Sequence, residues 1–352
     1  MPSLTQITLG SGVTTIGEAA FGETGLTSLT IPDTVTSMKD FAFHGCNELT
    51  SVTIGSGLNM ISREAFAQTG LTSLTVPSTV TVIDYGAFDQ CSALATVTLS
   101  NELVTIGAFT FRATPIKSIV LPNSVVTMNE GVFRDCYKLA QVTFGSGISS
   151  IGKAAFWETA LTSVVFPNSL TFIGFQAFFL CDKLTQVTFG SGSITIDAFA
   201  FGYSKLSNTL TIPDNVVSVG DNAFFENNIE CVRWKDFVGN EDRVFRDNPL
   251  TGCPPTPSNS PTAAPSAPTI NPTLAPSTWP TMEPSLHPSA DPSISPSVNP
   301  TLSPSAAPFI APTAAPSVTP TARPTVPALV NYELVVDVEQ VLRLCRIFIV
   351  DV

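Results

Sequence analysis

The sequence is poor in the side chains that carry out catalysis. Only 2 of its 352 residues are histidine, and only His44 lies ahead of the proline-rich C-terminal part. A catalytic Ser-His-Asp or Cys-His arrangement is therefore not expected, because each needs a histidine in the folded part of the chain. The chain also has no GxxxxGK[ST] phosphate loop, no HExxH zinc motif and no glycine-rich dinucleotide fingerprint. We expect no enzyme activity, no catalytic residue, no cofactor and no metal site.

Positive charge and long apolar runs are scarce as well. Lysine and arginine total 16 against 28 acidic residues, which gives a net charge of -12, and no basic cluster occurs. A nucleic-acid partner would need the opposite sign. The most apolar window, residues 334–350, is interrupted by charged residues, so we expect no transmembrane segment in this chain. No signal peptide is visible, because residues 4–10 already have the pattern of a repeat strand, and we expect further residues ahead of Met1.

What the sequence has instead is a repeat. Residues 25–69 are restated in 70–114, 115–159 and 160–204, and each 45-residue block consists of two similar halves of 22 and 23 residues. Self-similarity at this period predicts a solenoid, in which each unit buries its apolar face only against copies of itself. One phenylalanine anchors each unit, at steps of 22 or 23 residues: Phe21, Phe43, Phe66, Phe88, Phe111, Phe133, Phe156, Phe178, Phe201 and Phe224.

Each unit predicts a short strand, a turn and a return limb. In residues 26–32 the apolar Leu26, Leu29 and Ile31 are separated by polar residues, which is typical of a strand with one buried face. Proline or Gly-Ser-Gly then ends the strand, and the return limb carries the anchor phenylalanine into the core. Eleven strands in one parallel sheet are predicted, at 4–10, 26–32, 49–55, 71–77, 94–100, 116–122, 139–145, 161–167, 184–190, 206–213 and 229–235.

The pattern LxxLxIPxxVxxIGxxAFxxCxxL in residues 4–235 resembles the BspA-like leucine-rich repeat. The resemblance implies a β-dominated fold of the α/β repeat class, a right-handed leucine-rich-repeat solenoid with a parallel concave sheet. It also implies a role in adhesion and protein binding without catalytic residues. Residues 1–235 would form the solenoid, and the charged segment 236–253 would cap it.

Two surfaces of this solenoid are candidate binding sites for a protein or glycan ligand. The outward strand positions are almost all small and uncharged, and they are either a binding face or simply favourable strand residues. The hydroxyl residues of this set are Ser28, Thr30, Ser51, Thr53, Ser73, Thr75, Thr96, Thr98, Thr143 and Thr188. The second surface consists of aromatic residues where sister units carry small or polar ones, and these either bind a partner or pack on one another. They are Trp157, Phe172, Phe175, Phe179 and Phe225.

The cysteines fall into two groups. Four recur every 45 residues, three residues after an anchor phenylalanine: Cys46, Cys91, Cys136 and Cys181. On alternate rungs their Cα atoms would be about 9 to 10 Å apart, beyond the roughly 7 Å limit for a disulfide, so we expect buried free thiols. Cys231 and Cys253 flank the cap segment and form a disulfide only if the protein meets an oxidising compartment.

The composition changes at residue 254. From Pro268 to Pro324 a proline recurs every four residues, usually followed by serine or threonine, which predicts a disordered polyproline II stalk over 254–327. This stretch is similar to the proline-rich tracts of surface and secreted proteins of diatoms and related microalgae, which favours an extracellular or cell-surface location. Residues 328–352 could begin a further domain. The leading hypothesis is a monomeric adhesion module on a stalk, and the alternative is an intracellular scaffold.

Overall fold

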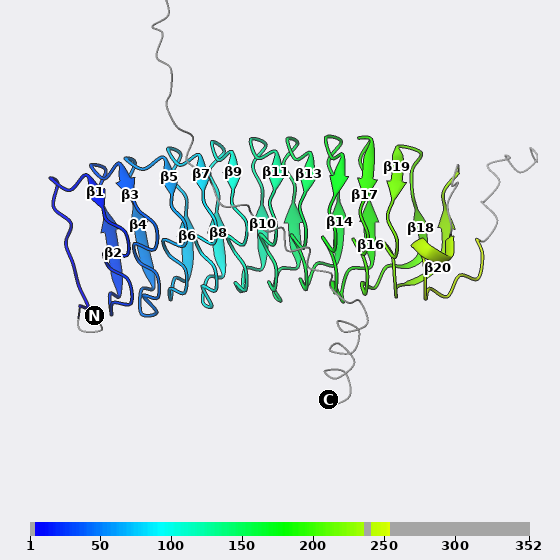
Figure 1. The fold of residues 1–352 in the computed structure, drawn as a ribbon, viewed down its shortest axis with the longest axis horizontal. Helices are drawn as coiled ribbons and strands as arrows, with labels where there is room; N and C mark the ends of the chain where they lie inside the picture. Colours follow the sequence, from blue (N-terminus) through cyan, green and yellow to red (C-terminus); the bar gives the residue numbers. More distant parts are fainter. Residues whose placement is uncertain (1–3, 236–240, 254–352) are drawn as a thin grey trace, which may run out of the picture. The chain divides into compact units, whose positions relative to one another are not determined.

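A computed structural model describes residues 4–235 and 241–253. Within them the chain winds into a parallel β-solenoid of about ten turns (Figure 1). We call each turn a rung and divide it into a first limb, a second limb and a third limb, which carries the anchor phenylalanine. The described residues contain one short helix, α1 (Glu241–Val244). The solenoid agrees with the repeat, whereas the predicted stalk 254–327 and the segment 328–352 lie outside the described residues.

The first limb differs from the single sheet that the sequence predicts. Its strands form hydrogen-bonded parallel pairs, as where Ser28 lies opposite Ser51, and successive pairs belong to different sheets. The first four pairs span the 23-residue steps and the 22-residue steps separate them. Residues 4–10 form no strand. The first-limb strands are β2 (Ser28–Ile31), β4 (Ser51–Ile54), β6 (Ser73–Thr75), β8 (Thr96–Thr98), β10 (Ser118–Val120), β12 (Gln141–Thr143), β14 (Ser163–Val165), β16 (Gln186–Thr188), β18 (Ser207–Thr211) and β20 (Asn228–Arg233).

The continuous sheet lies on the second limb. There, eight strands pair in parallel from β5 to β19, and each directs an apolar residue inward, such as Ile106 and Met128. β1 and β3 pair separately. The second-limb strands are β1 (Thr15–Ile16), β3 (Ser37–Met38), β5 (Met60–Ile61), β7 (Val82–Ile83), β9 (Thr105–Ile106), β11 (Thr127–Met128), β13 (Ser150–Ile151), β15 (Phe172–Ile173), β17 (Ile194–Ile196) and β19 (Val216–Val219).

The third limb stacks through backbone hydrogen bonds although it contains no strand. The Phe111 N–H donates to the Val132 carbonyl at 3.0 Å, and the Phe133 N–H donates to the Ala155 carbonyl at 2.8 Å. The residues two before and two after each anchor adopt left-handed backbone conformations, as at Gly131 (φ 59°) and Asp135 (φ 62°). Such conformations are unfavourable for most side chains. The third limb therefore depends on the rung-to-rung bonds to hold them.

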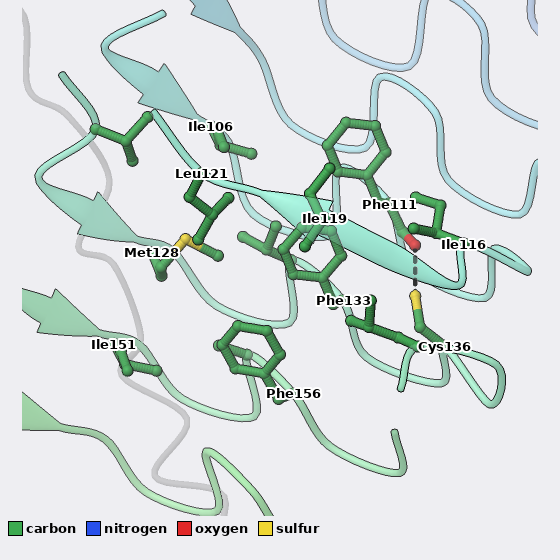
Figure 2. Close-up of a cluster of buried hydrophobic side chains, with 14 of the residues drawn as sticks. Ile106, Phe111, Ile116, Ile119, Leu121, Met128, Phe133, Cys136, Ile151 and Phe156 are labelled. Carbon is green, nitrogen blue, oxygen red and sulfur yellow. Dashed lines mark hydrogen bonds between the residues drawn. The ribbon is translucent and has the colours of Figure 1, made fainter. Parts of the chain in front are cut away.

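The anchor phenylalanines form one stack through the core. From Phe43 to Phe224 each side chain is fully buried, and neighbouring ring centroids are 5.1 to 5.7 Å apart. Figure 2 shows three of these rings in succession, with Ile119 and Met128 packed beside them. Offset-stacked rings at this distance gain stability beyond the apolar area that they bury.

The stack continues beyond Phe224, the last anchor that the repeat predicts. The Phe245 ring, just after α1, lies 5.3 Å from the Phe224 ring and is itself buried. Residues 244–247 repeat the sequence Val-Phe-Arg-Asp of residues 132–135, which is the signal in the sequence for this further anchor. Residues 241–253 thus form a modified rung.

A buried polar residue follows each anchor by three positions and satisfies phenylalanine carbonyls. Cys136 Sγ donates to the Phe111 carbonyl at 3.1 Å (Figure 2). Thr114 Oγ1 donates to the same carbonyl at 2.8 Å. Toward the C-terminus an amide takes this role, since Asn227 Nδ2 donates to the Phe201 and Phe224 carbonyls. Burial raises the pKa of the Cys136 thiol to about 12, so it stays protonated at neutral pH. The four cysteines expected to be free are free and buried.

A disulfide closes the cap. Cys253 is bonded to Cys231 on β20, with the two Cα atoms 4.7 Å apart. The Thr251 N–H also donates to the Glu230 carbonyl at 2.9 Å. The bond therefore holds the end of the cap against the last first-limb strand.

We predict that Phe133→Ala lowers the free energy of unfolding by about 3 to 5 kcal/mol, because it opens a cavity between two stacked rings. Phe21→Ala is the matched control, since Phe21 is only partly buried at the end of the stack and should lose much less. Urea denaturation followed by circular dichroism measures both. Equal losses for the two variants would contradict the proposed role of the stack.

We predict that the double variant Cys231→Ser/Cys253→Ser loses about 3 kcal/mol of stability, because the disulfide closes a loop with a sequence separation of 22 residues. The measurement is guanidinium denaturation with and without reductant. Reductant should destabilise the wild type and leave the double variant unchanged. A wild type that is insensitive to reductant would refute this prediction.

Candidate functional site

The first limb presents a face of exposed hydroxyl side chains. Along β2, Ser28 and Thr30 point to solvent while Leu29 and Ile31 are buried, and every other hydroxyl residue of the predicted set is exposed in the same way. The register continues from strand to strand within a pair, as where Thr30 lies opposite Thr53. We call this surface the first-limb face. The structure thus brings the ten predicted positions onto one side of the solenoid.

The first-limb face is hollowed between its strand pairs. Hollows of about 380, 400 and 600 Å³ lie between β8 and β10, β12 and β14, and β16 and β18. Each lies across a step at which the strands do not share a sheet. These hollows were not predicted from the sequence. The signal for them is the alternation of 22- and 23-residue units, which share one residue pattern.

The first-limb face is nearly free of charge. Among the described residues that line these three hollows, Lys117 alone is charged. The exposed side chains of Val120 and Val165 interrupt the rows of hydroxyl residues. Recognition on this face would therefore use hydrogen bonds and shape, with little electrostatic steering.

The predicted aromatic residues do not form one exposed patch. Trp157, Phe175 and Phe179 lie on the third limb with Phe225, whereas Phe172 lies on β15 of the second limb. Phe179 and Phe225 are buried, with exposed fractions of 3% and 6%. The other three are partly buried.

The third-limb aromatics pack on one another. The Trp157 and Phe179 rings are 4.8 Å apart, and Tyr203 lies against both Phe179 and Phe225. A Cβ atom on Gly202 would lie 3.0 Å from the Phe179 ring, so this glycine leaves the room that the ring fills. The packing supports the alternative in which these side chains complete the core.

Charged residues surround these aromatics. The Arg134 guanidinium lies 4.8 Å from the centre of the Trp157 ring, in a cation–π contact. On the same limb, Asp135 and Glu158 are half-buried on successive rungs. Burial raises the pKa of both carboxyl groups, and the Asp135 charge raises that of Glu158 further.

Among the described residues, no group of three or more histidine, cysteine or acidic side chains could hold a metal ion. In the same part of the chain, no helix is long and apolar enough to cross a membrane.

The winding and the repeat define a leucine-rich-repeat solenoid. More narrowly, the chain belongs to the family described as "BspA type Leucine rich repeat region (6 copies)", which matches residues 1–95, 59–185, 104–230 and 171–248. Proteins of this family are generally non-catalytic. No curated protein is found to match the chain.

Several solved structures are similar to the chain. A leucine-rich repeat protein from Bacteroides ovatus is 21% identical, with a TM-score of 0.44 and coverage of 65% of this chain and 67% of that one. A leucine rich cell surface protein from Faecalibacterium prausnitzii is 26% identical, with a TM-score of 0.43 and coverage of 66% and 68%. The pneumococcal vaccine antigen PcpA is 21% identical, with a TM-score of 0.42 and coverage of 65% and 71%.

We predict that Glu158→Gln stabilises the protein at pH 7 by about 0.5 kcal/mol, because the half-buried carboxylate is costly to keep charged and solvent screens part of that cost. A carboxyl pKa that is higher in the folded state means that stability rises as pH falls through that pKa. The advantage of the variant should therefore vanish below the ordinary value of 4.5. Thermal unfolding between pH 7 and 4 measures this, with exposed Glu102→Gln as control. An advantage that grows toward acid pH would contradict the assignment.

Proposed function

We propose that the chain is a non-enzymatic protein-binding module of the adhesion type, and that the first-limb face is its binding surface. The observation that carries the proposal is the first-limb face itself, a long row of exposed and uncharged hydroxyl side chains. These side chains point to solvent and are not part of the core. Solenoids use such extended surfaces to bind partners. Family membership supports a binding role over a catalytic one.

We further propose that the module works at the cell surface or outside the cell. The Cys231–Cys253 disulfide supports an oxidising compartment. The proline-rich composition of residues 254–327 supports a spacer with hydroxyl groups open to O-linked sugars. The alternative, an intracellular scaffold, requires a reduced and unmodified chain. Intact mass of the native protein separates the two, because the unmodified chain weighs 37.2 kDa.

We predict that Thr75→Arg/Thr98→Arg abolishes binding of the labelled full chain to cells of its source, because two paired residues in the middle of the face become bulky and charged. Thr105→Arg/Thr127→Arg is the matched control, since both residues are exposed but lie on the second limb. Flow cytometry on intact and protease-treated cells measures the binding. Equal binding of all three proteins, or equal loss in both variants, would sink the proposal.

A further inference from the structure

Of the three hollows on the first-limb face, the largest lies where the repeat is irregular. The step from Phe201 to Phe224 is 23 residues, although the alternation of steps calls for 22. The extra residue lies in the strand segment 206–213. In this segment Asn208 adopts a left-handed backbone conformation (φ 60°). The pairing of β18 with β20 also changes register there, because Asn208 lies opposite Ile229 and Thr209 lies opposite Cys231. The hollow beside it measures about 600 Å³, against about 400 Å³ for its counterpart between β12 and β14.

The side chains around this hollow are polar and uncharged. The polar ones are two amides and five hydroxyls: Thr185, Gln186, Thr188, Ser207, Asn208, Thr209 and Thr211. Asn208 Nδ2 is 3.4 Å from Ser207 Oγ, a long contact. Within the described residues, the side chains of Gln186 and Thr209 donate or accept no hydrogen bond, and both are exposed. Hydrogen-bonding capacity is therefore available to a bound molecule.

Backbone groups add to this capacity. The Phe166 N–H donates to the Thr188 carbonyl, so the backbone N–H and C=O groups of Thr188 point toward β14. Alternate residues of a parallel strand direct their N–H and C=O groups to opposite neighbours. The backbone groups of Val187 consequently face β18, which belongs to a different sheet. Groups of this kind require a hydrogen-bonding occupant, either water or a ligand.

Apolar atoms complete the hollow. Leu210 is buried beneath it, and Phe189 and Pro213 line one end. Ligand sites commonly measure about 300 to 1,000 Å³ and combine apolar walls with a few convergent polar groups. A saccharide matches this lining, because it presents many neutral hydroxyls at its edge and C–H groups on its ring face. Carboxylate and phosphate ligands do not match, since none of the described residues that line the hollow carries a positive charge.

We propose that the hollow between β16 and β18 is a binding site for a neutral saccharide. The inference rests on the proposed function, because the hollow is part of the first-limb face, and it names one class of molecule that the face recognises. The inserted residue gives this rung a specificity that the regular rungs lack.

The test is titration of the full chain with neutral hexasaccharides of glucose, mannose, galactose and N-acetylglucosamine. At least one should bind, and Gln186→Met/Thr209→Val should weaken that binding about tenfold or more, because two hydrogen-bonding side chains are replaced by apolar ones of similar size. Gln141→Met/Ser163→Ala is the matched control at the regular hollow between β12 and β14, and should leave binding unchanged. Circular dichroism verifies that both variants fold.

Binding of none of the four sugars, or equal weakening by both variants, would overturn the inference. So would a loss of cell binding in Gln186→Met/Thr209→Val without any sugar binding, which would assign the hollow to a protein ligand. The proposed function stands in these cases if Thr75→Arg/Thr98→Arg still abolishes cell binding. It fails separately if that variant binds cells normally.

Discussion

The stacking of one phenylalanine ring per rung is the constraint on which the rest of the structure depends. Neighbouring rings lie 5.1 to 5.7 Å apart, close to the spacing of about 4.8 Å between parallel strands. The ring stack and the backbone ladders can therefore run side by side for the length of the solenoid. Thr114, Cys136 and their equivalents satisfy the phenylalanine carbonyls that the core would otherwise leave without donors.

Because the second and third limbs carry the contacts that run continuously from rung to rung, the first limb is less constrained. The third limb carries the ring stack and the left-handed residues, and the second limb carries the eight-stranded sheet. The first limb contributes buried residues such as Leu29 and Leu74, but its strands need to pair only in twos. Its outward side chains need only be compatible with a β-strand, because they are not packed in the core. A surface of this kind can accept new side chains, and even the extra residue near Asn208, without disturbing the core.

The sequence predicts the parts of the fold that follow from a regular pattern. Phenylalanine spacing predicts the core stack, and alternation in segments such as 26–32 predicts the exposed hydroxyl face. The second-limb sheet could not be predicted from the sequence, because a two-residue strand such as β11 is too short to show an alternating pattern of apolar and polar residues. The role of Phe245 could not be predicted either, because its distance along the sequence from Phe224 differs from the 22 or 23 residues between the other anchors. The burial of Phe179 depends on Gly202 in the next rung, a relation that single positions do not reveal.

Hydrogen exchange of the full chain, resolved to single amides, tests most directly the claim that the third limb holds the solenoid while the first limb stays open for binding. The account predicts slowest exchange at the central anchors Phe111, Phe133 and Phe156, whose N–H groups donate to the next rung. It predicts faster exchange on the first limb, above all at amides such as Val187 that face the hollows. First-limb amides that exchange as slowly as the anchors would contradict it.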